Sequence, residues 1–190
     1  VELAQRALRP GIRLVLDMPD VLPAVHADPD QLVLAVLNLV VNARDAIEGV
    51  GNITLRVRED NDPEQEGLYP GRYLRIDVID DGCGMDEAVL ARAAEPFFTT
   101  KPTGQGTGLG LAVVKKIADE HRATVRIANL RQGEAPNERV AGARVSLSFS
   151  TFMPTPGLTL APGATLAGDA SSHPSPQGPA PANGETTKVH

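Results

Sequence analysis

The sequence is poor in cysteine and in aromatic residues. Cys83 is the only cysteine among 190 residues, there is no tryptophan, and aromatic residues make up 3% of the chain. A single cysteine excludes an internal disulfide and a metal site built from several thiolates. Few aromatic side chains are available for bases to stack on, and the formal net charge of −6 is unfavourable for binding a polyanion. We therefore expect no nucleic-acid partner.

Long apolar runs are also missing. No segment reaches the roughly 18–20 apolar residues that a membrane-spanning helix needs, and no signal peptide is recognisable. The single cysteine fits a reducing compartment, so we expect a cytoplasmic location, whether or not the parent protein is attached to a membrane. The opening residues, VELAQRALR, resemble the end of a longer helix or linker. We interpret residues 1–9 as the end of a linker from an upstream domain.

The composition changes near residue 151. From Thr151 onward the sequence consists mainly of Pro, Gly, Ala, Ser and Thr. Few large apolar side chains remain there to offset the entropy cost of ordering the chain. We interpret residues 151–190 as a disordered tail and residues 10–150 as one folded domain, long enough for a hydrophobic core.

Five segments of this domain alternate apolar and polar residues with period two. They cover residues 12–17, 53–58, 74–78, 124–127 and 144–149. This alternation predicts strands with one apolar face, whereas a doubly wound parallel sheet would show continuous apolar runs. The acidic segment 59–71 is expected to be a surface loop.

Three helices are predicted between the strands. For the first, Asp28 suits the N-cap, Pro29 suits the first helical position, and Gly49 suits the end. Residues 86–94 predict a short helix, and residues from about 108 to 121 predict another. The pattern therefore indicates an α/β two-layer sandwich, in which a mixed, mostly antiparallel sheet of about five strands is covered on one face by three helices. The predicted apolar stripe of the first helix consists of Leu32, Val33, Val36, Leu37, Val40 and Ile47.

An amide-rich face lies opposite that stripe. Asn38, Asn42 and Asp45 follow at i, i+4 and i+7, so they share one side of the first helix. A solvated helix face is the simpler interpretation, but such faces usually carry Lys and Glu. Asn oxygens are neutral hard ligands that suit Mg²⁺ together with phosphate oxygens.

A carboxylate ends the third predicted strand on its buried side. Asp80 continues the parity of Leu74, Ile76 and Val78, and a buried carboxylate is costly without a partner. Gly82 and Gly84 open space beside it. The alternative is a tight turn in which Asp80 bonds local backbone N–H groups.

The segment KPTGQGTGLGLAVV contains four glycines that lead into a helix. Backbone N–H groups and the helix dipole at such a helix start can bind an anion. The spacing fits neither a P-loop nor the dinucleotide-binding G-x-G-x-x-G pattern. The alternative is a flexible loop before a loosely capped helix.

Taken in order, four blocks resemble the catalytic and ATP-binding domain of sensor histidine kinases, within the Bergerat-fold (GHKL) ATPases. NLVVNARDA resembles the N box, DDGCGM the first glycine box, EPFF the F box and GTGLGL the second glycine box, with ADPDQL before them. The resemblance covers about residues 10–149. NARDA and FFTTK are similar to the forms in nitrogen-regulation-type and hybrid kinases.

The resemblance implies ATP and Mg²⁺ as cofactors. It implies that Asn42 coordinates the Mg²⁺ that bridges the phosphates, that Asn38 supports the same site, and that Lys101 reaches a phosphate as a point charge. These are the expected catalytic residues, and Asn42 is the expected metal ligand.

The resemblance also implies an adenine end and a lid. Asp80 would accept a hydrogen bond from the adenine amino group, Gly82 and Gly84 would let the backbone approach the base, and Met85 would line its pocket. Residues 95–106 would be the ATP lid, anchored by Phe97 and Phe98; we expect 101–106 to be poorly ordered without nucleotide and Thr107 onward to be ordered either way. The other expected ATP-binding residues are Asp45, Thr100, Gly106, Thr107, Gly108, Leu109 and Gly110.

One position separates the activities within this group. Clamp-type relatives carry a glutamate four residues before the magnesium asparagine, whereas this sequence has Asn38, and a neutral amide cannot take a proton from water. The resemblance therefore implies a protein-histidine kinase, which transfers the γ-phosphoryl group of ATP to a histidine on a separate dimerisation domain of the same protein, for relay to the receiver domain of a response regulator. The alternatives are an ATP-hydrolysing clamp and an inactive nucleotide-binding scaffold.

Three features depart from the family pattern or concern the acceptor. Asp45 stands where many sensor kinases have a basic residue. Arg122-Ala123 replaces a frequent Gly-Gly pair, so we expect a different or less stable helix end. The four histidines of the chain are His26, His121, His173 and His190. None of them lies in a helical acceptor context, so we expect the acceptor histidine to lie outside this chain.

Overall fold

The computed structural model describes residues 2–61, 68, 71–102, 106–131 and 140–151. The chain divides into two units, residues 1–153 and 154–190, and the second lies outside the described residues. The predicted tail therefore lies outside them as well, apart from Thr151. Most of the acidic segment 59–71 and lid residues 103–105 also lie outside them.

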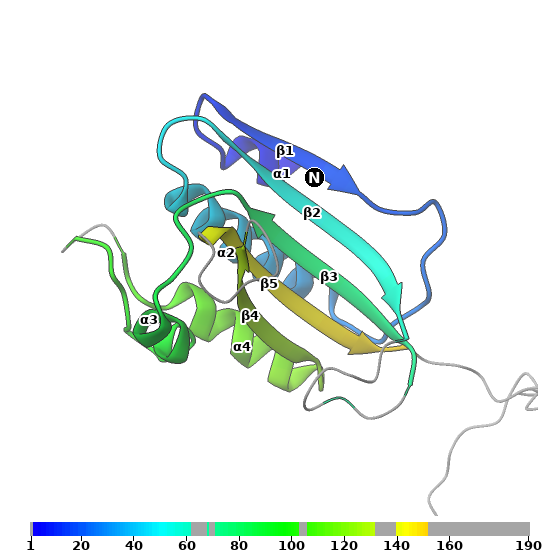
Figure 1. The fold of residues 1–190 in the computed structure, drawn as a ribbon. Coiled ribbons are helices and arrows are strands. Elements are labelled where there is room, and N and C mark those ends of the chain that lie inside the picture. The colour runs from blue at the N-terminus through cyan, green and yellow to red at the C-terminus, as the bar shows by residue number, and fades with distance from the viewer. Residues whose placement is uncertain (1, 62–67, 69–70, 103–105, 132–139, 152–190) are drawn as a thin grey trace, which may run out of the picture. The chain divides into compact units, whose positions relative to one another are not determined.

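A five-stranded sheet forms one layer of the domain (Figure 1). Its strands are β1 (Ile12–Asp17), β2 (Gly51–Asp60), β3 (Tyr73–Asp80), β4 (Thr124–Arg131) and β5 (Val140–Ser150). The order across the sheet is β1-β2-β3-β5-β4; β1 runs parallel to β2, and the other neighbours are antiparallel. The predicted mixed, mostly antiparallel sheet is confirmed.

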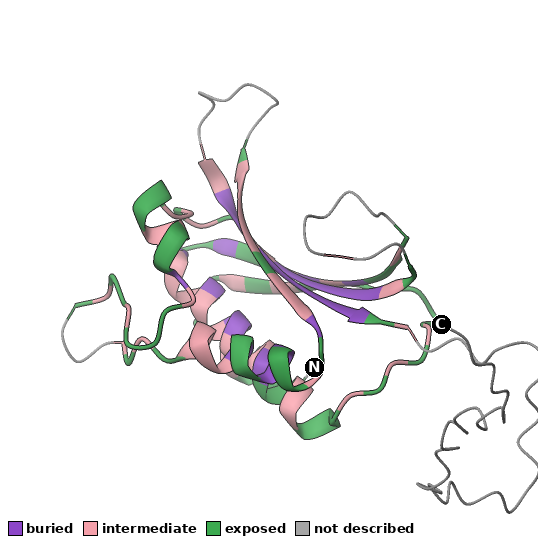
Figure 2. Ribbon diagram, turned by 90° about the horizontal axis from the view of Figure 1, so that it is seen from below, coloured by how far each residue is buried: buried purple, intermediate pink, exposed green. Residues whose placement is uncertain are grey.

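Four helices occur among the described residues: α1 (Glu2–Arg6), α2 (Pro29–Ala46), α3 (Glu87–Arg92) and α4 (Gly110–Glu120). Figure 2 shows the helices on one side of the sheet. As predicted, Asp28 caps α2, because its side chain accepts hydrogen bonds from the backbone N–H groups of Asp30 and Gln31. Helix α3 buries none of its residues, so α2 and α4, together with Ala4 of α1, supply the helical side of the core.

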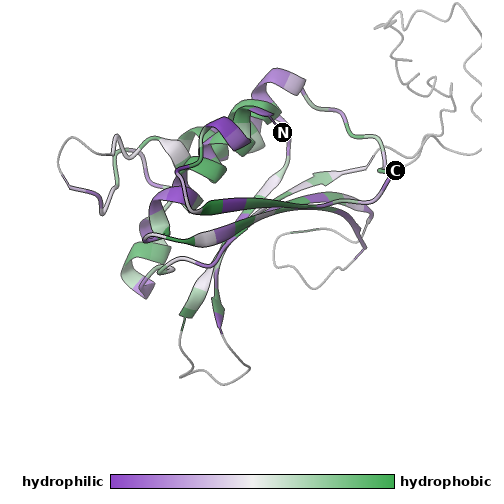
Figure 3. Ribbon diagram, turned by 90° about the horizontal axis from the view of Figure 1, so that it is seen from above, coloured by the Kyte–Doolittle hydropathy of each residue, from purple (hydrophilic) through white to green (hydrophobic). Residues whose placement is uncertain are grey.

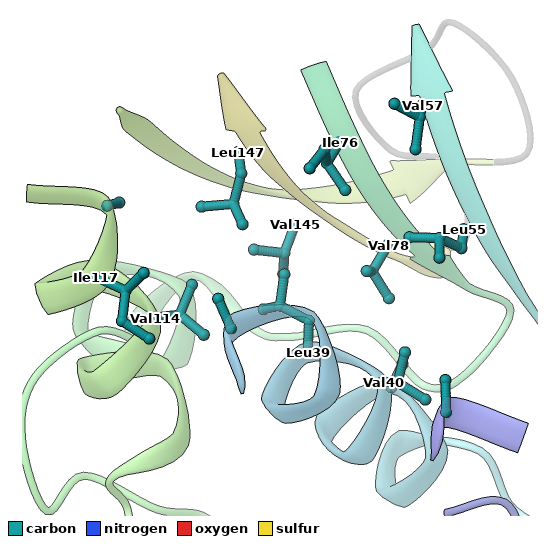
Figure 4. Packing of buried hydrophobic residues seen from close by; sticks show 14 of the residues in the cluster. Leu39, Val40, Leu55, Val57, Ile76, Val78, Val114, Ile117, Val145 and Leu147 are labelled. Atoms are coloured by element: carbon teal, nitrogen blue, oxygen red, sulfur yellow. The ribbon is translucent and has the colours of Figure 1, made fainter. Parts of the chain in front are cut away.

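The core lies between α2, α4 and the central strands. Figure 4 shows Leu39 and Val40 of α2 and Val114 and Ile117 of α4 pointing toward the apolar residues of β3 and β5. Burial of this kind stabilises a domain by about 25 cal/mol for each Å² of apolar surface removed from water. Along the strands hydrophobic and hydrophilic residues alternate, as the period-two pattern predicted (Figure 3).

The buried stripe of α2 differs from the predicted one. Val33 is 49% exposed, whereas Ala35, Leu39, Val40 and Ala43 are buried. Helix α2 packs against both the sheet and α4, so its buried surface turns toward the two alanines, whose small side chains allow close approach. The prediction placed the stripe too far toward Val33.

The other face of the sheet carries a buried ionic network. Arg75 donates hydrogen bonds to Asp77 at 2.8 Å, to Asp60 at 2.9 Å and to the hydroxyl of Ser146 at 3.0 Å. Asp77 is 1% exposed. The opposite charges of Arg75 and Asp77 offset the cost of removing each from water.

Helix α4 ends in a left-handed residue. Arg122 has a φ of 53°, and the N–H of the following Ala123 donates to the carbonyl of Ala118 at 2.8 Å. Glycine usually occupies such a position because it has no Cβ to clash. The C-terminal end of α4 therefore keeps the geometry of a glycine cap, although Arg122 occupies the left-handed position.

Candidate functional site

A cavity of about 610 Å³ lies between α2, the end of β3, the lid and the start of α4. Its size is within the usual range for small-molecule sites. Most of the predicted site residues line it: Asn38, Asn42, Asp45, Asp80, Gly84, Met85, Thr100, Lys101, Gly106, Thr107, Gly108 and Gly110.

Three predicted site residues do not line this cavity. The Phe97 side chain is 76% exposed, and Leu109 is exposed at the N-cap of α4. Gly82 lies behind Asp80, where an added Cβ would overlap the carbonyl of Ala46. Phe98 lines the cavity instead of Phe97, and its ring lies 4.3 Å from the guanidinium carbon of Arg92 on α3.

Asp80 is held at the end of β3 by one of its two oxygens. Oδ1 accepts hydrogen bonds from the backbone N–H groups of Gly82 at 3.0 Å and Ala143 at 3.3 Å. No described residue donates a hydrogen bond to Oδ2 of this cavity-lining side chain. Burial raises the pKa of Asp80, the two backbone donors oppose the rise, and the neighbouring Asp81 adds to it. The site therefore offers one fixed carboxylate with one free acceptor.

Strand β5 approaches Asp80 closely through Gly142. This glycine has a φ of 137°, and an added Cβ would overlap the carbonyl oxygen of Asp80. Only glycine fits this conformation and this contact. Gly142 therefore fixes the strand end that carries the carboxylate.

The loop after Asp80 is anchored to strand β4. The side chain of Asn129 accepts a hydrogen bond from the N–H of Met85 at 2.9 Å and donates one to its carbonyl at 2.6 Å. These two bonds pair the Asn129 side chain with the Met85 backbone. They hold the Met85 backbone at the cavity wall.

The amide face of α2 meets the start of α4. A Cβ added to Gly110 would lie 3.2 Å from Nδ2 of Asn42 and 3.5 Å from Oδ1 of Asn38. Asn38 donates to the Leu34 carbonyl at 2.8 Å, whereas the side chain of Asn42 has no hydrogen bond to any described residue. A half-buried amide whose oxygen is free can serve as a metal ligand through that oxygen.

Helix α4 begins without a side-chain cap. The N-cap is Leu109, and its side chain accepts no hydrogen bond from the first turn. Gly108 precedes it with a φ of 65°, and a Cβ there would overlap the backbone of Phe97. The first N–H groups of an uncapped helix are available to an anion.

Asp45 is the counter-ion of three cations. Its Oδ1 accepts from Arg9 at 2.8 Å and from Arg44 at 2.8–2.9 Å, and its Oδ2 accepts from Nζ of Lys101 at 2.6 Å. The Asp45 side chain is 12% exposed. Burial alone would raise the pKa of Asp45, but the hydrogen bonds from Lys101 and Arg44 hold it below its ordinary value. The cluster carries an excess of positive charge beside the cavity.

The described residues contain no cluster of three or more His, Cys, Asp or Glu side chains that could hold a metal ion. A divalent ion at Asn42 would therefore need further oxygen ligands from phosphate and water, which is how Mg²⁺ is usually held beside nucleotides.

No helix among the described residues is long and apolar enough to cross a membrane.

Sequence reasoning missed several residues that shape the site. Gly142 could have been found, because an isolated glycine within a strand pattern indicates close backbone approach. The amide of Asn129 and the guanidinium of Arg9 had no local signal, because each contacts a segment distant in the sequence.

Comparison with known proteins adds to this geometry. Residues 27–152 match the family described as histidine kinase-, DNA gyrase B- and HSP90-like ATPases. The sensor histidine kinase ZraS of Escherichia coli O157:H7 is 39% identical over 119 residues, which are 63% of this chain and 23% of ZraS. The chain thus spans about a quarter of the length of that relative.

Two solved structures share the fold. The nucleotide-free catalytic domain of the histidine kinase ThkA has a TM-score of 0.57 and 26% identity, over 79% of this chain and 84% of that domain. Full-length ShkA in complex with AMPPNP has a TM-score of 0.57 and 26% identity, over 80% of this chain and 28% of ShkA. Since the family match runs from the residue before the α2 cap through the end of β5, the chain belongs to the histidine kinase-, DNA gyrase B- and HSP90-like ATPases.

Proposed function

We propose that this domain binds Mg·ATP in the cavity and is the ATP-binding catalytic half of a cytoplasmic protein-histidine kinase. The observation that carries the proposal is the geometry of Asp80. Two backbone N–H groups fix its Oδ1, and its Oδ2 has no donor among the described residues. That oxygen suits the amino group of adenine, which is a donor, and disfavours the carbonyl oxygen of guanine, which is an acceptor.

At the other end of the cavity, several groups suit a triphosphate. The uncapped start of α4 offers backbone N–H groups, and Arg44 and Lys101 supply positive charge. Asn42 would hold Mg²⁺, with Asn38 beside it, and the ion would neutralise charge on the phosphate oxygens. The free amide of Asn42 fits this role, whereas Asp45 is occupied by cations.

The carboxylates around the cavity support phosphotransfer over hydrolysis. Among the described residues that line it, the carboxylates are Asp45, Asp80 and Asp86. Asp45 is ion-paired, Asp80 is at the base end, and Asp86 accepts a hydrogen bond from Val89 at the start of α3. None of them lies beside Asn42 as a free general base for water, so the terminal phosphoryl group is kept for another acceptor.

The proposed acceptor is a histidine on a separate dimerisation domain of the parent protein. Its ring nitrogen would form a bond to the γ-phosphorus as the bond to the leaving ADP oxygen breaks, and the phosphoryl group would pass on to a response-regulator receiver domain. His121 is unsuited, because one ring nitrogen bonds the Ile117 carbonyl and the other accepts from the N–H of Asp28. His26 is exposed in the segment before α2 and does not lie on a helix, so it lacks the helical setting expected of an acceptor.

The test is a nucleotide titration with Asp80→Asn. Asn keeps an oxygen for the backbone donors but presents N–H groups where Oδ2 was. We expect ATP affinity to fall about tenfold to a hundredfold and the preference for ATP over GTP to narrow. Asp81→Asn removes an equal charge from an exposed side chain that bonds Asn52, and it should leave both affinities unchanged.

Phosphotransfer is measured with labelled ATP and the parent protein's dimerisation domain. Wild type should label that domain in a Mg²⁺-dependent reaction, and Asn42→Ala should abolish the label. Equal ATP affinity of wild type and Asp80→Asn would contradict the adenine role, and robust hydrolysis without labelling would favour the clamp alternative.

A further inference from the structure

The Asp45 cluster connects three separate parts of the chain. Arg9 comes from the segment between α1 and β1, Arg44 from α2, and Lys101 from the lid. The two arginines share Oδ1, and Lys101 is the one described residue that donates to Oδ2. Whatever changes the charge on Asp45 therefore changes how strongly it holds the lid lysine.

The segment before β1 has further attachments to the domain. Arg44 donates a hydrogen bond to the carbonyl of Ala7 at 2.8 Å, and Ala4 is buried in the core. Arg44 thus bonds both the segment and Asp45. Arg9 is the more exposed partner, with 58% of its side chain exposed, so its pair with Asp45 is the more easily broken one.

We propose that Arg9 controls how readily Lys101 reaches a bound nucleotide, so that the segment preceding the domain is coupled to the phosphate end of the site. This inference rests on the proposed function and makes Arg9 and Asp45 positioning residues.

The direction of the coupling follows from electrostatics. With Arg9 on Oδ1, part of the negative charge of Asp45 is neutralised, so its attraction for Lys101 weakens and the lysine can exchange to a phosphate oxygen. Without Arg9, Asp45 holds Lys101 more strongly, and the nucleotide must compete for it.

Coupling of this kind is reciprocal. If Arg9 raises the affinity for a polyphosphate, the polyphosphate strengthens the docking of Arg9 by the same factor. A nucleotide without the distal phosphates has no contact to exchange with Lys101, so it should show neither effect. AMP is therefore the internal control for ATP.

The experiment compares Arg9→Gln with Arg6→Gln in the full chain. Arg6 lies at the end of α1, is exposed, and has no ion pair with any described residue, so it matches the charge change without the Asp45 contact. We expect Arg9→Gln to weaken Mg·ATP binding about two- to fivefold, as for an exposed ion pair, and to leave AMP binding unchanged. Arg6→Gln should change neither.

The same titration in an Asp45→Asn background tests whether Arg9 acts on Lys101 through the Asp45 carboxylate. The effect of Arg9→Gln should disappear there, because the shared carboxylate is gone. Hydrogen exchange should show ATP, but not AMP, protecting the backbone of residues 2–9.

Three outcomes overturn the inference: equal effects of Arg9→Gln and Arg6→Gln, an Arg9→Gln effect that persists in Asp45→Asn, or no effect of Arg9→Gln on a wild-type protein that binds ATP. Failure of the wild type to bind ATP would instead overturn the proposed function.

Discussion

Nζ of Lys101 lies 2.6 Å from Oδ2 of Asp45, and Arg9 and Arg44 bind the other oxygen of the same carboxylate. A residue that the resemblance assigned to a phosphate is thus held by an acidic residue of α2. The pair joins the lid to the helix that carries Asn42, and removing its carboxylate has consequences for stability as well as for binding.

Asp45→Asn should lower the free energy of unfolding at pH 7 by about 1–3 kcal/mol, because a carboxylate shared by three cations is lost. Burial alone would raise the pKa of Asp45, but its partners hold it below the ordinary 3.8. The stabilisation is therefore complete above pH 3.8 and is lost as pH falls through the lower pKa of the folded state.

Urea unfolding between pH 7 and pH 3 checks this prediction. The stability difference between wild type and variant should shrink below about pH 4. Asp119→Asn, at an exposed pair with Lys115, is the control and should cost under about 0.5 kcal/mol. A difference that stays constant across the range would contradict the prediction.

Asp80→Asn should have the opposite pH signature. Burial raises the pKa of Asp80, so the folded state binds the proton more tightly than the unfolded state does. Wild type therefore loses stability as pH rises from about 4 through the raised pKa, and the variant does not. Relative to wild type the variant should gain stability toward neutral pH even though it binds ATP less well; a variant that loses stability over that interval would refute this.

Gly142→Ala should be severely destabilising, by more than about 3 kcal/mol, because its Cβ would overlap the Asp80 carbonyl at a φ of 137°. Gly49→Ala is the matched control. Gly49 also has a positive φ, of 80°, but a Cβ there meets nothing within 4 Å, so only the backbone strain of about 1–2 kcal/mol applies. Thermal unfolding of both variants measures the difference, and equal losses would rule out the close contact as the cause.

Arg122→Gly should stabilise the domain. Arg122 occupies a left-handed conformation with a φ of 53°, which costs about 1–2 kcal/mol for a residue with a Cβ. Glycine removes this cost but gains unfolded-state entropy, so a net increase of up to about 1 kcal/mol is expected. The unfolding midpoint in urea should rise, and a fall would show that the arginine side chain contributes more than its backbone strain costs.

The elements and most of the cavity lining were predictable because their signals are local. Period-two alternation located the strands, and Asp28-Pro29 located the start of α2. The parity of β3 placed Asp80 on its buried side, and it is buried there. Glycine spacing located the start of α4 within two residues.

The errors in the sequence-based prediction arise where tertiary packing determines which side chains are buried. The α2 stripe was misplaced because the period of a helix does not reveal how many partners its face has. β1 shows a regular apolar alternation, and its Ile12 and Leu14 pack against the core, yet Leu16 toward the end of this edge strand is 41% exposed. The choice between Phe97 and Phe98 could not be made from adjacent identical residues; it depends on the positive φ of Phe97.

The cavity borders two helices and a strand end that are distant in the sequence, and Gly110 of one helix lies there beside Asn42 of the other. A ligand that contacts all three joins them in the folded state and has no such site in the unfolded chain. By mass action, a nucleotide at one hundred times its dissociation constant should raise the free energy of unfolding by about 2.7 kcal/mol. The melting temperature of the isolated chain thus becomes a direct measure of nucleotide occupancy, independent of any acceptor domain.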